Sequence, residues 1–241
     1  MKKNKFIAFT LAEVLITLGI IGIVAQMTIP TLTKSVQQQQ YITRLKNVYS
    51  EMNQALLMMS LDSGCTGKLD CFYDSNNDIV MGDKIASYFK IAKNCKINSG
   101  INEWNGYPGG CGDESIKPNY DGSGTPITGM AGYRFITVSG YTIILWGAPT
   151  VGCGVTYDKG PMSSGCQVIV IDTNGPGNPN TFGLDVFEFF ITDGKGPQIY
   201  PLGGQYYNFR RWNPEGWCTE SNKSGASCGG RIMEEGWQMN Y

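Results

Sequence analysis

Histidine is absent from the 241 residues of this chain, and charged residues are scarce at 16%. Without histidine there is no Ser-His-Asp triad, no Cys-His dyad and no histidine-ligated metal site. The 19 basic and 20 acidic residues give a net charge of −1, which argues against a basic nucleic-acid-binding protein. A nucleophile elbow and a phosphate-binding loop are missing as well, so we expect neither an enzyme nor a nucleic-acid partner.

Cysteine is missing from the first 64 residues, although the chain contains eight. An even number of cysteines confined to the later part indicates an exported, oxidised domain behind an N-terminal segment of a different kind. Many pairings are open. The simplest expectation joins sequence neighbours: Cys65–Cys71, Cys95–Cys111, Cys153–Cys166 and Cys218–Cys228. Zinc is the alternative, but no C-x-x-C pair and no histidine support it.

The N-terminal segment is apolar enough to cross a membrane. Lys2, Lys3 and Lys5 form a basic head, and residues 9–32 follow with Glu13 as their one charge. About 20 apolar residues span a bilayer, and the basic head should stay in the cytoplasm. We therefore expect a single pass through the cytoplasmic (inner) membrane, with the N-terminus inside and the cysteine-containing part outside.

Three interpretations of this segment are open. It is a signal peptide cut after Ile23-Val24-Ala25, a plain anchor, or an anchor in which Glu13 has a function. A carboxylate within an apolar segment is costly, and ionisable groups in membrane helices usually have a partner. Glu13 therefore favours the third interpretation.

The residues Ala8-Phe9-Thr10-Leu11-Ala12-Glu13 carry a family resemblance. The segment resembles the prepilin peptidase site of type IV pilins and type II secretion pseudopilins. The resemblance implies cleavage between Ala8 and Phe9, methylation of the Phe9 amine, and a glutamate, Glu13, at the fifth mature position. Gly22 and Pro30 then match the pilin glycine and proline. Ala8 departs from the usual glycine before the cut, which implies less efficient cleavage.

This resemblance implies a structural subunit, a pilin or pseudopilin, of a type IV pilus-like or type II secretion-like filament. Its implied partners are other pilins, the prepilin peptidase and an assembly platform in the membrane. Glu13 of an incoming subunit would pair with the Phe9 amine of the previous one, and the filament would lie in the periplasm or at the cell surface. The alternative is a membrane-anchored extracellular domain that binds a sugar or surface ligand and does not polymerise.

One long helix is expected to begin at Phe9 and to continue beyond the membrane to about Leu61. Its second half carries apolar residues at spacings of three and four, which predicts a stripe packed on the protein's own core: Tyr41, Leu45, Val48, Met52, Leu56 and Met59. Pro30 is expected to kink or locally melt the helix. The divisions are a leader (1–8), an assembly helix (9–32), an amphipathic half (33–61) and a head (62–241).

The head is expected to have an α+β fold, with the long helix on an antiparallel sheet of about four strands. Residues 133–138 and 141–146 flank Ser139-Gly140, a hairpin pattern, and β-branched and aromatic residues predict further strands over 167–171 and 185–191. We expect a short edge strand over 198–202 and a short helix within 79–92. The family resemblance adds a pilin-like ladle with disulfide-rich loops.

A loop over residues 172–185 offers candidate metal ligands. Asp172, Asn174, Asn178 and Asp185 supply hard oxygens, and its glycines allow tight turns. Calcium is therefore one hypothesis for a cofactor. The other is a turn held by its own Asx hydrogen bonds.

Overall fold

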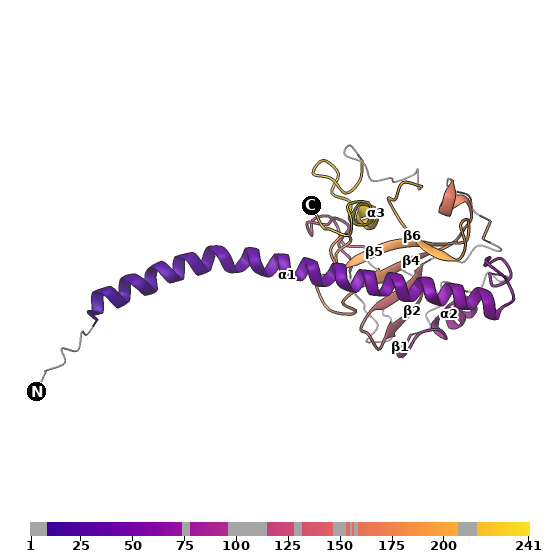
Figure 1. Ribbon diagram of the computed structural model, residues 1–241, viewed down its shortest axis with the longest axis horizontal. Coiled ribbons are helices and arrows are strands. Elements are labelled where there is room, and N and C mark those ends of the chain that lie inside the picture. Colours follow the sequence, from indigo (N-terminus) through magenta and orange to yellow (C-terminus); the bar gives the residue numbers. More distant parts are fainter. Residues whose placement is uncertain are drawn as a thin grey trace, which may run out of the picture. The chain divides into compact units, whose positions relative to one another are not determined.

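The structure is a computed structural model that describes residues 9–73, 78–95, 115–127, 132–146, 153–154, 156, 159–206 and 216–241. The chain divides into two compact units, Met1–Gln40 and Tyr41–Tyr241. The first contains the N-terminal part of helix α1 (Leu11–Asp62), and the second contains the remainder of α1 and all other elements (Figure 1). The predicted leader 1–8 lies outside the described residues.

The second half of α1 forms the core of the second unit. The predicted apolar stripe is confirmed, because Leu45, Val48, Met52, Leu56 and Met59 are fully buried in the main hydrophobic cluster. Tyr41 is only half-buried. Asn53, on the same helix, accepts a hydrogen bond of 2.8 Å from the Ile199 amide of the last strand.

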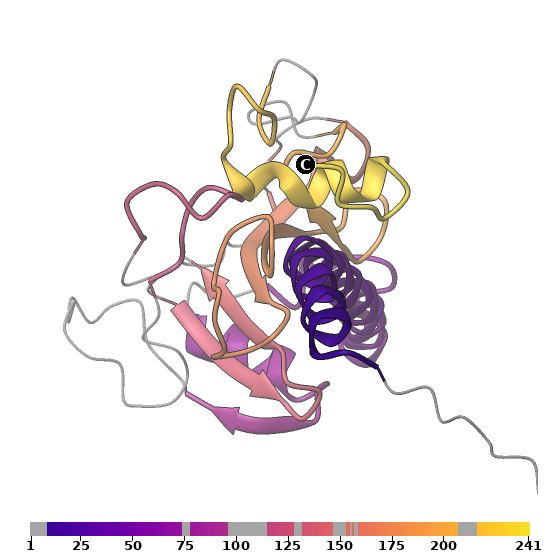
Figure 2. The same cartoon turned by 90° about the vertical axis from the view of Figure 1, so that its left-hand side faces the viewer.

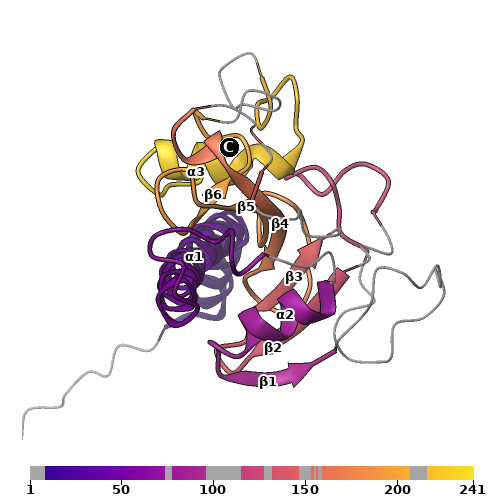
Figure 3. The same ribbon diagram turned by 90° about the vertical axis from the view of Figure 1, so that its right-hand side faces the viewer.

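A six-stranded antiparallel sheet follows in strict sequence order. Its strands are β1 (Ile91–Asn94), β2 (Gly132–Thr137), β3 (Thr142–Trp146), β4 (Gly165–Asp172), β5 (Val186–Thr192) and β6 (Gln198–Pro201). Figure 3 shows the order from β6 to β1, with α1 against one face. The predicted hairpin and edge strand are confirmed as β2–β3 and β6. The α+β class is confirmed with it.

Strands β2 to β5 are buried on both faces of the sheet. The side toward α1 carries Phe135, Ile143, Ile169 and Phe189, which join the main cluster. On the other side, Ile144, Val170 and Val186 of the strands form a smaller cluster with Ile116 and Phe182 from neighbouring loops. Burial on two faces explains why β5 reads as an almost continuous apolar run instead of an alternating pattern.

The expected number of strands was too low, and the expected helix within 79–92 was too long. Helix α2 (Asp78–Ala86) ends early, and residues 91–94 form β1 at the sheet edge instead. Gly82 explains how closely α2 approaches the sheet, since an added Cβ there would collide with the Tyr133 ring. The Tyr133 hydroxyl donates to Asp83 at 2.6 Å and fixes the contact.

The C-terminal segment packs on the same core. Two 3-10 turns, η1 (Gly160–Ser163) and η3 (Gly225–Ser227), precede helix α3 (Cys228–Glu234), which lies beside β5 (Figure 2). Ile232 is fully buried, and the Trp237 ring meets Tyr49 of α1 edge-on at 5.5 Å. The segment thus covers α1 from the side opposite to α2.

Disulfides hold the loops of the second unit. Three of the expected bonds are confirmed, Cys65–Cys71, Cys153–Cys166 and Cys218–Cys228. Cys95 is disulfide-bonded as well, and its expected partner Cys111 lies outside the described residues.

Candidate functional site

The first unit exposes its apolar side chains on all sides. No residue of its most apolar 18-residue stretch is buried, and the helix is long and apolar enough to span a membrane. The exposed large side chains are Phe9, Leu11, Val14, Leu15, Ile16, Leu18, Ile20, Ile21, Ile23, Val24, Met27, Ile29, Leu32 and Val36. At about 1.5–3 kcal/mol each, leaving them in water costs on the order of tens of kcal/mol. This surface is therefore suited to a cover of lipid or of other protein chains.

Glu13 closes a capping box at the start of α1. The Thr10 hydroxyl accepts a hydrogen bond of 3.2 Å from the Glu13 amide, and Glu13 Oε2 accepts bonds of 2.8 Å from the Thr10 amide and hydroxyl. These contacts satisfy two amides that a helix start leaves without partners. The spacing Thr-x-x-Glu before an apolar run is the sequence signal from which this role could be predicted.

The second carboxylate oxygen of Glu13 has no such role. Both bonds from Thr10 reach Oε2, and within the described part of the chain no donor reaches Oε1. A carboxylate oxygen placed among apolar groups needs a donor or a cation. The geometry therefore leaves Oε1 without a donor among the described residues. Ala8, on the other side of the expected cut, lies outside the described residues.

Gly22 is not explained by the chain's own packing. A Cβ added at Gly22 or at Gly19 would have no atom within 4 Å. Small residues on an apolar helix allow a neighbouring helix to approach closely. The two glycines thus mark a surface suited to helix–helix contact.

The local melting expected at Pro30 is not observed. Helix α1 is assigned without a break from Leu11 to Asp62, so this part of the prediction is wrong. The missing proline amide costs one hydrogen bond, to the carbonyl four residues earlier. Nearby hydroxyls bond other carbonyls of the same stretch, Thr28 to Val24 and Thr33 to Ile29, and the helix continues.

The loop over 172–185 satisfies its own acidic side chains. The Asp185 carboxylate is fully buried and accepts hydrogen bonds from the amides of Asn180 (2.9 Å) and Thr181 (2.7 Å). Burial raises the pKa of Asp185, and these bonds oppose the rise. Asp172 accepts from the Asn174 amide, and the Asn174 side chain donates to the Asn178 carbonyl. These contacts favour the Asx-turn alternative; calcium binding stays a hypothesis.

A second group of potential ligands lies near the Cys153–Cys166 bond. The two sulfur atoms and an Asp193 carboxylate oxygen lie within 4.8 Å of one another. Because the sulfurs are joined to each other, neither is a thiolate that binds metal. Asp193 also accepts the Leu69 amide at 2.8 Å. In the oxidised protein this group serves structure.

No family model, no curated protein and no solved structure matches this chain. Its function must therefore be argued from the residues themselves.

Proposed function

We propose that this protein is a structural subunit, a pilin or pseudopilin, of a type IV pilus-like or type II secretion-like filament, processed by a prepilin peptidase. The observation that carries the proposal is the all-round apolar surface of the first unit, in which residues 9–32 contain Glu13 as the one charge. The prepilin-like segment Ala8–Glu13 supports the same role. The pilin-like ladle belongs to this proposal as well.

Bundling of these helices explains the surface better than lipid alone. Lipid covers Leu and Ile side chains as well as a neighbouring helix does, but lipid tails offer Glu13 Oε1 neither a hydrogen-bond donor nor a cation. In a filament, the Phe9 amine created by cleavage supplies a cation at a similar depth for Glu13 of a neighbour. Gly19 and Gly22, which have open space around them, allow the helices to approach. The capping box keeps the Glu13 side chain folded back on Thr10 until a neighbour arrives.

Two roles of Glu13 have to be separated by experiment: a cap within the subunit and a charge partner between subunits. Glu13→Gln keeps hydrogen-bonding capacity toward Thr10 but removes the charge, since glutamine also serves in capping boxes. Thr10→Ala removes the hydroxyl but leaves the charge. Both variants are produced with a prepilin peptidase and an assembly platform, and the sheared filaments are quantified.

We expect Glu13→Gln to abolish filaments and Thr10→Ala to reduce them only partly. The N-terminal residue and the intact mass of each variant, which should show a methylated Phe9, serve as the control for processing. Normal filaments from Glu13→Gln would overturn charge pairing. A wild-type protein that is processed but never forms filaments would favour the membrane-anchored, non-polymerising domain, and a start at Gln26 would identify an ordinary secreted protein.

A further inference from the structure

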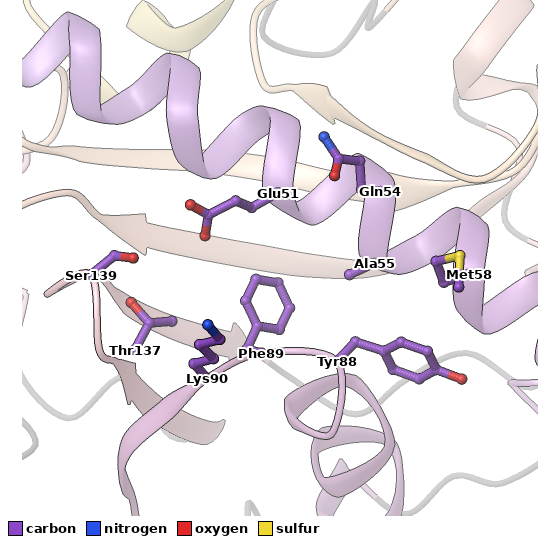
Figure 4. Close-up of a pocket in the computed structure, with 9 residues that line it drawn as sticks. All are labelled: Glu51, Gln54, Ala55, Met58, Tyr88, Phe89, Lys90, Thr137 and Ser139. Atoms are coloured by element: carbon purple, nitrogen blue, oxygen red, sulfur yellow. The ribbon is translucent and has the colours of Figure 1, made fainter.

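A groove of about 460 Å³ opens in the second unit between α1 and the start of the sheet. Three separate parts of the chain line it: α1, the segment before β1, and the β2–β3 hairpin (Figure 4). The lining residues are Glu51, Gln54, Ala55, Met58, Tyr88, Phe89, Lys90, Thr137 and Ser139. Small-molecule sites commonly have volumes of about 300–1,000 Å³. The groove is thus large enough for a ligand of a few tens of heavy atoms at most.

One end of the groove carries two side chains of opposite charge that form no ion pair with each other. Figure 4 shows Glu51 of α1 on the side of Thr137 and Ser139, with the Lys90 ammonium group between these residues and the Phe89 ring. Neither charged side chain has a hydrogen bond or an ion pair within 4.0 Å in the described part of the chain. Glu51 is half-buried, and burial raises the pKa of its carboxyl group. A partly buried carboxylate without a partner favours a bound cation.

The two hydroxyl groups at this end differ in their hydrogen bonding. Thr137 Oγ1 is engaged by Tyr141, whose amide donates to it at 3.1 Å. The Ser139 hydroxyl, in the hairpin turn, has no hydrogen bond among the described residues. Ser139 can therefore donate to, or accept from, a molecule in the groove.

The other end of the groove is apolar. The Phe89 ring, Ala55 and Met58 form most of its surface, with Gln54 beside them, and Met58 is 50% exposed. The Tyr88 hydroxyl donates to Asp62 at 2.8 Å, which fixes the ring that closes this end. Phe89 packs against Phe135 of the sheet at 5.6 Å between ring centroids, which supports the floor of the groove.

From this arrangement we infer that the groove binds a small zwitterion with an apolar side chain, namely a hydrophobic amino acid or a short peptide built from such residues. Glu51 takes the ammonium group, Lys90 takes the carboxylate, and Ser139 adds a hydrogen bond. The apolar side chain lies over Phe89 and Ala55 toward Met58. Charge-assisted bonds at both ligand ends provide the orientation, because such bonds are about twice as strong as neutral ones.

Free amino acids and peptides offer the same groups at different separations. In an amino acid one carbon joins the ammonium and carboxylate groups, whereas a dipeptide places a whole residue between them. Glu51 and Lys90 do not approach to ion-pair distance, so both ligands are tested. This inference does not depend on the filament proposal, since all lining residues belong to the second unit.

The test is calorimetric titration of the full chain in detergent micelles with L-leucine and with the dipeptide Leu-Leu. Three further probes each lack one feature: N-acetyl-leucine lacks the ammonium group, 3-methylbutylamine lacks the carboxylate, and glycine lacks the apolar side chain. We expect saturable binding of leucine or Leu-Leu, at least tenfold tighter than that of any probe lacking a feature. If L-leucine binds more tightly, the ligand is a free amino acid; if Leu-Leu binds more tightly, it is a short peptide.

Two variants test which side chain binds which charged group of the ligand. Glu51→Gln and Lys90→Met should each weaken zwitterion binding at least tenfold, and Lys90→Met should leave 3-methylbutylamine binding unchanged. Glu220→Gln and Lys195→Met, both at exposed positions, are the matched controls and should bind as the wild type does. Unchanged melting temperatures verify that the variants fold. No saturable binding of either zwitterion at millimolar concentration, or equal weakening by the controls, would overturn the inference.

Discussion

The two halves of helix α1 share one continuous backbone but treat their apolar side chains in opposite ways. Between Tyr41 and Asp62 a narrow stripe is apolar, and the sheet together with the segments around it buries Leu45 to Met59 of this stripe. From Phe9 to Leu32 the apolar surface surrounds the helix, and none of its most apolar stretch is buried. A stripe indicates one neighbouring surface, which the chain itself supplies. A helix that is apolar all round is instead suited to neighbours on every side, which in our proposal are lipid and other copies of this helix.

Truncating the stripe should produce the largest effect on stability. Leu56→Ala removes a fully buried side chain from the main cluster and should lower the free energy of unfolding of the second unit by about 2–5 kcal/mol. Leu18→Ala removes the same atoms from a side chain that is 61% exposed and should leave this unfolding unchanged. Thermal unfolding in detergent, followed by near-ultraviolet circular dichroism, measures both. Similar losses for both variants would mean that the first half also packs on the chain's own core.

The glycines of α1 and α2 provide a second contrast. Gly82→Ala inserts a methyl group into the Tyr133 ring, and overpacking of this kind should cost about 1–3 kcal/mol. Gly22→Ala has open space around it and should leave the melting of the second unit unchanged, although it should weaken the helix–helix contacts of the proposed filament. The same melting experiment on Gly82→Ala and Gly22→Ala is decisive. A stable Gly82→Ala protein would show that α2 moves away from the sheet at little cost.

Sequence patterns predicted the elements whose local pattern fits a single secondary structure, namely the second half of α1 and the β2–β3 hairpin. The three-and-four spacing of residues 45–59 has one interpretation, and the Ser139-Gly140 turn between two β-branched runs has one as well. Strand β1 was missed because Ile91 and Ala92 fit helical spacing as well as an edge strand, and only pairing with β2 decides between them. Helix α3 was missed because its two glycines, Gly229 and Gly230, lower helix propensity, and tertiary contacts override that preference.

The candidate functional residues could likewise be predicted only where a local pattern revealed them. Glu13 was recognised from its cost in an apolar segment, but its bonds to Thr10 follow from a local spacing that was overlooked. The groove, in contrast, joins Glu51, Lys90 and Ser139 from three distant parts of the sequence. No periodicity or motif relates these positions, because their proximity arises only when α1, β1 and the hairpin have packed.

The C-terminal segment should contribute less than the stripe. Trp237 meets Tyr49 edge-on, and Lys46 lies 5.6 Å from the centre of the Trp237 ring. Trp237→Leu keeps an apolar side chain but removes both ring interactions, so we expect a loss of about 1–2 kcal/mol. Trp146→Leu, at an exposed strand end, is the control and should change stability less. If the two variants melt alike, the segment contributes little to the cover of α1.

The smallest expected effect concerns an exposed ion pair and depends on pH. Lys223 lies 2.8 Å from Asp121, and this bond, together with those from Ser123, holds the pKa of Asp121 well below its usual value. A carboxyl group whose pKa is lower in the folded protein stabilises the fold above its unfolded pKa of about 3.9, and the contribution disappears as the pH falls through the folded pKa. Asp121→Asn should therefore melt slightly below the wild type at neutral pH and approach it in acid. Because both side chains are partly exposed, salt should reduce the difference as well. A difference that persists in acid would show that the hydrogen bonds of Asp121, and not its charge, stabilise this loop.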